Sequence, residues 1–532
     1  MNRKSFLYFT NSIILLILLV SVAASIFLGI EYTDSGYILG LAHRISIGQQ
    51  IYFDFDYVRP PLSPLLWSLP LHLEIEPKEI LIRAFVVLQK FVIAYLLYKT
   101  LQKCDVDKYR ALFSSVVAFS FLMHHIPSMP WHTVDGLFFS MISVASYSRR
   151  MPIFAILFAV LAALTKQSYY FLPFVFVMIA FLHFPKHRLS ISASLILVFL
   201  SLWQNSFIIE FTRIASGTTS IIDFLKAAVA PHILLARNVF SFTYFLIMLT
   251  VLLLLKGRAT KYLIGVAVLF PIANIGLIVL YQLFTEQGTG FLSPSYAVTQ
   301  LAMSFSVIHI LVVLRKYGSA VFKDMNFQIA ILLLAAAWMS SISWGYANYM
   351  FAYGFILSAN IVLMKDREFF DKYTLTAITL IVVTAFLVFR LGIPYRMVSP
   401  LTNEYEMVDS GHYKYVWASE ADFGKLASLE KIFDLGGCLD TYPATPQFAV
   451  IDRRIPTLRA DWKMDIEFPS FASAVPILTD QRCKLFIEKD YNFSEDHGRF
   501  VVSAIELNSY QHCLVDFDEY FYLLDFSTCE PR

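Results

Sequence analysis

Long apolar runs constrain this chain more than any other feature. They recur about 13 times, and a helix needs roughly 20 residues to cross a bilayer. They lie at residues 7–30, 81–98, 111–126, 133–148, 152–165, 168–184, 189–209, 239–255, 262–284, 297–314, 327–344, 349–364 and 374–393. Several runs, particularly 152–165 and 168–184, are shorter than a full crossing and are expected to be tilted or to end in a water-filled cavity. Of the 532 residues, 57% are hydrophobic and 15% charged, well below the roughly 25% charged of soluble domains. The sequence predicts an α-helical polytopic membrane protein.

The positions of Lys and Arg predict the orientation of the spans. Basic residues gather in alternate loops, as the positive-inside rule expects of cytoplasmic loops. They include Arg3 and Lys4, Lys99 to Arg110, Arg149 and Arg150, Lys186 and Arg188, Lys256 to Lys261, Arg315 to Lys323 and Lys365 to Lys372. An odd number of spans then gives a cytoplasmic N-terminus and an extracytoplasmic C-terminus in the cell membrane. The net charge of +2, without a basic patch, argues against a nucleic-acid partner.

The composition changes at Pro394, where the long apolar runs stop. Residues 1–393 are expected to form the membrane domain, with an outer loop at 31–80, and residues 394–532 a small extracytoplasmic α/β domain. Alternating runs predict strands at 447–451, 484–488, 500–505 and 520–524. Residues 421–435 predict a helix that ends at Gly436 and Gly437.

Four of the five cysteines lie in this C-terminal segment: Cys438, Cys483, Cys513 and Cys529. In an extracytoplasmic domain, this number allows up to two disulfides, with three possible pairings if all four join. A zinc site is the weaker interpretation because no two of these cysteines have the Cys-x-x-Cys spacing.

The outer loop begins with a polar segment that follows the first apolar run. Apolar residues from Tyr37 to Ile45 have helical spacing, with Asp34 in the first turn and Gly48 as a C-cap. This predicts a short amphipathic helix in the membrane interface. The loop continues through Asp54 and Asp56 to Arg59, directly before two prolines, which holds acids and a cation at one membrane face.

This loop carries a resemblance to a known group of proteins. It reads aromatic-x-Asp-x-Gly-Tyr at residues 32–37, then Ile-Tyr-x-Asp at 51–54 and Arg-Pro-Pro-Leu at 59–62. The pattern resembles the first extracytoplasmic loop of the GT-C superfamily of membrane glycosyltransferases. The groups most similar are the aminoarabinose transferases and the dolichyl-phosphate-mannose protein mannosyltransferases, which take sugars from polyprenyl-phosphate carriers.

The resemblance implies a catalytic role for two acids. Asp34 matches the acid after the first span, which would activate the acceptor hydroxyl, and Asp135 resembles the second acid of the superfamily. The alternative for each is an acid that stabilises a helix N-terminus. The family often has two adjacent acids where this chain has Asp34 and Ser35. Glu31 and His132 are accessory candidates, for which a structural role is the favoured interpretation.

The resemblance also implies cations that would bind the donor phosphate. Arg59 matches the basic residue before Pro-Pro, with a snorkelling arginine as the alternative. Thr165-Lys166-Gln167 resembles the Thr-Lys-Gly of the aminoarabinose group, and Lys166 is the main exception to the charge alternation. Arg237 is a further candidate for phosphate binding.

No cofactor is required by the sequence, although Asp54 and Asp56 could bind a divalent cation. The alternative is that they orient the loop or form a solvated face. Gly288 and Gly290 lack the context of a dinucleotide fingerprint, and no Walker A sequence is present, so a nucleotide is not expected as the energy source.

The expected function is transfer of a sugar from a polyprenyl-phosphate carrier to a hydroxyl of a lipid, glycan or protein acceptor, on the extracytoplasmic face of the membrane. A ligase that moves a whole oligosaccharide is a second hypothesis of the same class. A polytopic transporter or a flippase for lipid-linked sugars is the alternative from another class. Against it, the sequence shows no repeated halves, and its polar candidates gather at one face.

Overall fold

The structure is a computed structural model, and it describes residues 3–55, 57, 59–73, 75–123, 125–202, 292–343, 346–347, 350–364, 371–392, 394, 397–442, 447–453, 458, 475–489 and 511–529. Two compact units divide the chain. Unit 1 holds residues 1–25, 85–128 and 132–395, and unit 2 holds residues 26–84, 129–131 and 396–532. Unit 2 therefore combines the outer loop with the C-terminal segment, and its last portion begins close to the boundary expected at residue 394.

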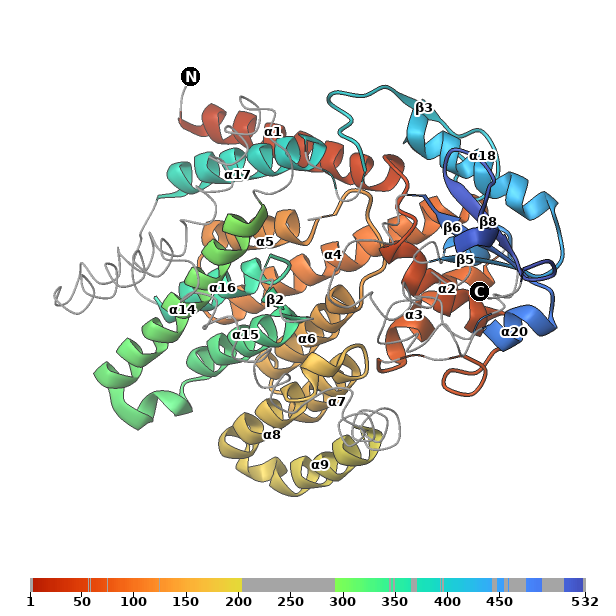
Figure 1. Cartoon of the computed structure of the whole chain (residues 1–532). Coiled ribbons are helices and arrows are strands. Elements are labelled where there is room, and N and C mark those ends of the chain that lie inside the picture. Colours follow the sequence, from red (N-terminus) through yellow and green to blue (C-terminus); the bar gives the residue numbers. More distant parts are fainter. Residues whose placement is uncertain are drawn as a thin grey trace. The chain divides into compact units, whose positions relative to one another are not determined.

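Unit 1 is helical in its described part (Figure 1). Its elements are α1 (Arg3–Phe27), α4 (Lys78–Lys103, whose first turns belong to unit 2), α5 (Lys108–Leu122), α6 (His132–Ser148), α7 (Pro152–Ala163), η1 (Gln167–Tyr169), α8 (Leu172–His183), η2 (Pro185–His187), α9 (Arg188–Leu202), α14 (Leu292–Tyr317), η5 (Gly318–Lys323), α15 (Met325–Ser341), the hairpin strands β1 (Ile342–Ser343) and β2 (Tyr346–Ala347), α16 (Tyr353–Leu363) and α17 (Lys372–Gly392).

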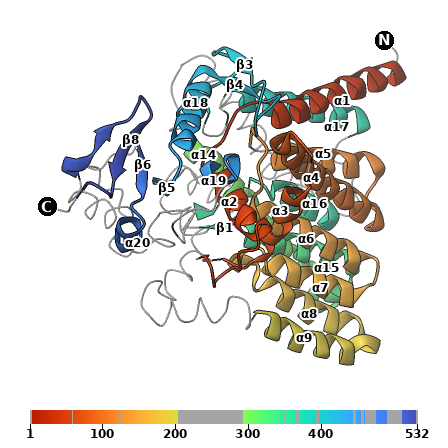
Figure 2. The same ribbon diagram turned by 90° about the vertical axis from the view of Figure 1, so that its right-hand side faces the viewer.

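Small residues allow the helices of unit 1 to approach closely. A Cβ atom at Gly354 of α16 would lie 2.1 Å from the Cβ of Ala118 of α5, so only glycine fits there. On the same two helices, the hydroxyls of Ser114 and Ser358 lie 2.6 Å apart and share a buried hydrogen bond. Helices α1 and α17 lie side by side in both views (Figures 1 and 2). Packing of small and hydroxyl residues is typical of membrane helix bundles.

Four helical segments in the described residues are long and apolar enough to cross a membrane: 5–27, 78–103, 302–323 and 372–392. A fifth is added if the bent pair 167–183 and 185–194 forms one span. The other apolar runs within the described residues also form helices, but shorter ones. The several apolar helices agree with the prediction, while the count of 13 stays a prediction. The runs at 239–255 and 262–284 lie outside the described residues.

Unit 2 combines helices with short strands. Besides the first turns of α4, its elements are α2 (Asp34–Ser46), α3 (Leu62–His72), β3 (Tyr405–Met407), β4 (Trp417–Ser419), α18 (Glu420–Asp434), β5 (Leu439–Tyr442), α19 (Gln447–Ile451), α20 (Val475–Asp480), β6 (Lys484–Glu488), η7 (Gln511–Cys513), β7 (Val515–Asp516) and β8 (Phe521–Asp525). The larger sheet has the strand order β5-β6-β8-β7. Strands β5 and β6 are parallel, and β6 and β7 each pair with β8 in antiparallel fashion.

Strand β6 is buried on both faces. Leu485 and Ile487 enter one hydrophobic cluster, while Phe486 between them enters another. This alternation follows from the two-residue period of a strand. The second cluster also contains Ile30 and Tyr32, so the segment between α1 and α2 packs into the same core as the C-terminal strands.

Four of the C-terminal predictions fall on described residues with a clear outcome. The helix expected at 421–435 is α18, and Gly436 and Gly437 adopt positive φ angles of 60° and 78° after its end. The strands expected at 484–488 and 520–524 are β6 and β8. The strand expected at 447–451 is wrong, because this segment forms helix α19. A short apolar run has no decisive period. The strand predicted at 500–505 lies outside the described residues.

The structure selects one of the three disulfide pairings. Cys438 bonds to Cys483, and Cys513 bonds to Cys529. Cys104 is buried and takes part in neither disulfide. The hydrogen-bonded strands β5 and β6 begin next to Cys438 and Cys483, so the sheet brings the first pair together although 45 residues separate them in the sequence.

The helix expected at the start of the outer loop is present as α2, followed by Gly48 with a φ of 93°. Its environment differs from the prediction of an interfacial helix. Residues 34–44 are all buried, because α3 and α19 pack against it. A Cβ at Gly36 would lie 2.4 Å from the backbone nitrogen of Gln447. Tertiary packing thus encloses both faces of α2.

Candidate functional site

Glu31 organises the start of helix α2. Its two carboxylate oxygens accept hydrogen bonds from the backbone N–H groups of Thr33 (3.1 Å) and Ser35 (2.6 Å). The first N–H groups of a helix have no partner within the helix, and Glu31 supplies partners there. Whether Glu31 also has an accessory role in a reaction stays a prediction.

Asp34 is the first residue of α2 and is only 2% exposed. Tyr37 lies three residues later, on the same face of the helix. The Arg59 guanidinium carbon stands 5.4 Å from the centre of the Tyr37 ring, and Arg59 is itself buried. A hydrogen bond of 2.6 Å from the Tyr52 hydroxyl to the Arg59 carbonyl fixes this part of the loop. Unit 2 thus gathers an acid and a cation around one turn of α2.

Asp54 has a simpler environment than Asp34. It is exposed, and its carboxylate accepts a hydrogen bond of 2.7 Å from the backbone N–H of Gln50. This bond closes the turn between residues 50 and 54, as the loop-orienting alternative expects. Asp56 lies outside the described residues, so the divalent-cation site proposed for this pair stays a prediction.

Unit 1 contains the second acid. Asp135 lies in the first turn of α6 and is completely buried. Its carboxylate accepts a hydrogen bond of 2.7 Å from the side-chain amide of Gln89 on α4. His132, the first residue of α6, is also buried. Burial of a carboxylate within a helical bundle is costly unless hydrogen bonds or charges compensate it.

Lys166 is held against the same turn of α6. It has an extended backbone between α7 and η1, is 5% exposed, and donates a hydrogen bond of 3.1 Å from Nζ to the Thr133 hydroxyl. Tyr169 donates from its hydroxyl to the Thr133 carbonyl at 2.9 Å. The sequence prediction for Asp135 and Lys166 therefore names residues that meet at one helix turn through Thr133.

Gly136 makes room for this arrangement. A Cβ atom at this position would lie 2.2 Å from the Tyr169 ring, so any other residue would displace the ring. The carboxylate of Asp135 acts electrostatically on the Tyr169 hydroxyl, which places both groups in one buried polar cluster.

Sequence reasoning missed four residues that support the two candidate groups: Tyr37, Gln89, Thr133 and Tyr169. Gln89, Thr133 and Tyr169 are common polar or aromatic residues within apolar segments, outside any motif that predicts chemistry, whereas Tyr37 ends the motif at residues 32–37 but was interpreted only as part of an apolar helix face. Gln89 was detectable in principle, because an amide in a membrane-spanning helix needs a polar partner. Arg237 lies outside the described residues and remains a predicted phosphate ligand.

Tyr32, two residues before Asp34, is held in place by contacts with α18. Burial, together with the nearby Asp422, raises the pKa of Tyr32 well above its usual value of 10. Its hydroxyl donates to the Asp422 carbonyl at 3.0 Å, and the Lys425 ammonium lies 5.0 Å from its ring centre. The neutral phenol thus ties the beginning of the outer loop to α18.

Comparisons with known proteins give a fold likeness only. No known protein family matches the sequence, and no curated protein matches it. The chain is similar to two solved structures of ArnT from Cupriavidus metallidurans. The apo structure has 9% identity and a TM-score of 0.43, and 99% of each chain is covered. The structure bound to undecaprenyl phosphate has 11% identity and a TM-score of 0.38, and 100% of each chain is covered.

ArnT is an aminoarabinose transferase, one of the groups that the sequence motifs resemble. Because both TM-scores lie below 0.5, the function of this chain has to be argued from its own residues. Among the described residues, the one set of side chains with metal-ligand geometry is His512, Cys513 and Cys529, and its two cysteines are joined in a disulfide.

Proposed function

We propose that this protein is a membrane glycosyltransferase that moves a sugar from a polyprenyl-phosphate carrier to a hydroxyl acceptor on the extracytoplasmic face. The observation that carries the proposal is the buried cluster at the first turn of α6, where Asp135 accepts a hydrogen bond from Gln89 and the buried Lys166, from the segment between α7 and η1, donates to Thr133. Buried ionisable groups in a helical membrane bundle are costly to retain and therefore indicate function.

The reaction needs a base at the acceptor and positive charge at the leaving group. The acceptor oxygen would form a bond to the anomeric carbon, while the bond from that carbon to the phosphate oxygen breaks and its electron pair stays on the phosphate. The acceptor proton would pass to a carboxylate, for which Asp34 is the proposed base. Arg59 and Lys166 would stabilise the departing polyprenyl phosphate. Direct displacement inverts the anomeric configuration.

Each proposed role has support within its own unit. Asp34 is buried at the start of α2, and Arg59 lies over the ring of Tyr37 one turn later. An arginine in this position can bind a phosphate through two parallel hydrogen bonds. Lys166 presents a compact ammonium beside the first turn of α6. Asp135 is proposed to fix the local charge and to orient the polar groups around it.

The test is transfer of radiolabelled sugar from membrane polyprenyl-phosphate donors in vesicles. At equal expression, Asp34→Asn is expected to lower the rate by at least about 100-fold, because it removes a general base. Lys166→Gln is expected to lower it by about 100-fold, because it removes charge stabilisation. Asp409→Asn and Lys316→Gln change exposed residues in the same way and serve as controls. Transfer unaffected by both site variants would overturn the assigned roles, and no transfer with any donor would favour a transporter or flippase.

A further inference from the structure

Helix α3 of unit 2 keeps its serines on the buried face and exposes leucines on the other. Ser63 is fully buried, and Ser68 is 4% exposed. In contrast, the exposed fractions of Leu65, Leu69 and Leu73 are 43%, 62% and 41%. Residues four apart lie on the same face of a helix, so these three leucines form one line along α3 and its C-cap. This set of three residues is the leucine stripe.

Helix α18 of the same unit has the opposite arrangement. Its Leu429 and Ile432 are fully buried, whereas Glu430 and Lys431 are exposed. This is the usual pattern of a helix that faces water on one side. Residues 62–71 of α3 contain no charged residue, and a contiguous exposed apolar surface marks a place of contact with a protein or a membrane. The leucine stripe is therefore poorly suited to contact with water.

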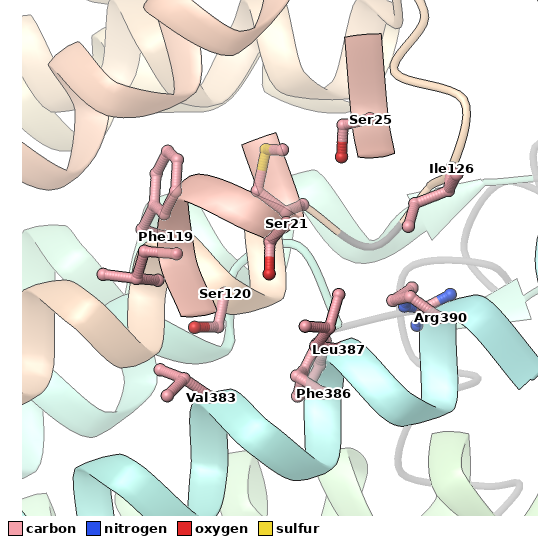
Figure 3. Close-up of a pocket in the computed structure, with 11 residues that line it drawn as sticks. Ser21, Ser25, Phe119, Ser120, Ile126, Val383, Phe386, Leu387 and Arg390 are labelled. Atoms are coloured by element: carbon pink, nitrogen blue, oxygen red, sulfur yellow. The ribbon is translucent and has the colours of Figure 1, made fainter. Parts of the chain in front are cut away.

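Helix α1 of unit 1 shares the arrangement of α3 on a longer helix. It is long and apolar enough to cross a membrane, and its Leu15, Leu16 and Leu19 are exposed. Its Ser21 and Ser25 instead lie around a small cavity that residues of α1, α5 and α17 line (Figure 3). In a membrane, polar side chains turn toward the inside of the helical bundle and leucines contact the lipid. Lipid is thus the environment that fits the leucine stripe.

The end of α3 is tied to the start of a helix that can cross a membrane. Helix α3 has 11 residues, about half of the roughly 20 that a crossing needs, so it can contact lipid only at the membrane surface. Helix α4 is long and apolar enough to cross, and it begins at Lys78. The Lys78 ammonium donates a hydrogen bond of 3.0 Å to the carbonyl of Leu71. This bond holds the last turn of α3 at the point where α4 enters the membrane.

We propose that the leucine stripe of α3 inserts into the lipid at the membrane surface where α4 begins. Leu65, Leu69 and Leu73 lie among the upper parts of the acyl chains, and the serines of α3 stay on the face that is buried within unit 2. An interfacial position was expected of α2 from the sequence, but α2 is buried, and α3 takes that position instead. The inference concerns the attachment of unit 2 to the bilayer and does not depend on the reaction that the protein catalyses.

The experiment labels the full-length native protein from within the lipid. The protein is reconstituted in vesicles of phosphatidylcholine that carries a diazirine on its acyl chain, and light produces a carbene that inserts into nearby C–H bonds. Proteolysis and tandem mass spectrometry locate the insertions. Residues 62–73 are expected to be labelled at least about tenfold more than residues 426–434 of α18, because transfer of the exposed apolar area of the stripe from water to lipid is favourable. Exposed leucines of α1 provide the reference for full contact with lipid.

A double variant tests whether the stripe itself makes the contact. Leu65→Gln combined with Leu69→Gln changes only exposed side chains, and it should lower the labelling of residues 62–73 by about tenfold, because most of the apolar area is lost. Leu435→Gln changes a leucine of unit 2 that is 43% exposed and lies outside α3, and it should leave this labelling unchanged.

Two results would overturn the proposal. One is labelling of residues 62–73 in the native protein that is no stronger than that of residues 426–434, which would mean that water or a second copy of the chain covers the stripe. The other is full labelling of residues 62–73 in the double variant. The first comparison uses the native protein alone, so it remains decisive even if the double variant folds poorly.

Discussion

Two groups of buried charges in this protein differ in how the charge is compensated. In unit 2, Glu79 and Arg83 form a salt bridge of 2.8 Å, and His412 Nε2 lies 3.2 Å from the other oxygen of Glu79. Arg83 also donates to the carbonyls of Ile26 (3.1 Å) and Gly29 (2.8 Å) at the end of α1. Glu79 and Arg83 are therefore each surrounded by protein groups that carry an opposite charge or an opposite partial charge.

In unit 1, the buried Lys90 donates a hydrogen bond of 3.2 Å to the Ser128 hydroxyl, a neutral group. Arg390 is also buried, and its guanidinium carbon lies 4.5 Å from the ring centre of Phe389. The fold thus balances Glu79 and Arg83 with opposite charges, whereas Lys90 and Arg390 contact a neutral hydroxyl and an aromatic ring.

The largest effect on stability is expected at Glu79, whose charge is compensated by neighbouring protein groups. Glu79→Gln leaves the buried Arg83 without its anion, and it should lower the free energy of unfolding by about 3–5 kcal/mol. Chemical denaturation in detergent micelles would measure this. Arg110→Gln, which breaks a more exposed pair with Asp107 at 2.9 Å, is the control and should cost about 0–1 kcal/mol. Equal losses in the two variants would contradict the structural role of Glu79.

A smaller effect of opposite sign is expected in unit 1. Lys90→Met removes a buried charge and should raise the free energy of unfolding by about 1 kcal/mol in a zwitterionic detergent, because a charge buried beside a neutral partner is unfavourable. The same denaturation experiment applies. A loss of stability as large as that of Glu79→Gln would refute the comparison.

The smallest effect on stability is expected for Asp422, whose carboxyl is only partly compensated by neighbouring groups. Asp422 belongs to the capping box of α18 with Ser419. Burial raises its pKa, although the hydrogen bonds from Ser419 and the charges of Lys425 and Arg83 lower it. The pKa of Asp422 in the folded state thus lies above the unfolded value of about 3.9. The contribution of this carboxyl to the free energy of unfolding is therefore complete at low pH, and it is lost as the pH rises through the folded-state pKa.

Asp422→Asn tests this sign, because asparagine cannot ionise. The stability of the wild type relative to Asp422→Asn is expected to fall as pH rises from about 4 toward neutrality. Unfolding of both proteins at a series of pH values would measure the difference. A relative stability that increases with pH would show that Lys425 and Arg83 outweigh burial.

Much of the local structure was predictable because it depends on neighbouring residues. Helix α18 follows from its apolar spacing and the two glycines after it, and β6 follows from its alternating pattern. Helix α19 was predicted as a strand, since a five-residue segment with four apolar residues fits either period. The burial of α2 was also missed, because it depends on α3 and on α19, more than 400 residues later in the chain.

The residues of the candidate site also divide into those that the sequence predicted and those that only the structure revealed. Asp34, Arg59, Asp135 and Lys166 were predicted as site residues from the family resemblance, and the structure buries all four. Their partners Gln89, Thr133, Tyr169 and Tyr37 were not predicted as such, because each meets its partner through tertiary contacts. The sequence favoured a structural role for Glu31, and the structure supplies its two backbone N–H partners at the start of α2.

By itself, the sequence determined the membrane character of the chain, the alternation of basic loops and the possibility of two disulfides, because these depend on composition and spacing. The tertiary structure decided which cysteines pair, which acid caps α2, and that Lys166 meets α6 at Thr133. Spacing governs local periodicity, whereas the partner of a buried polar group is set by whichever distant segment packs against it.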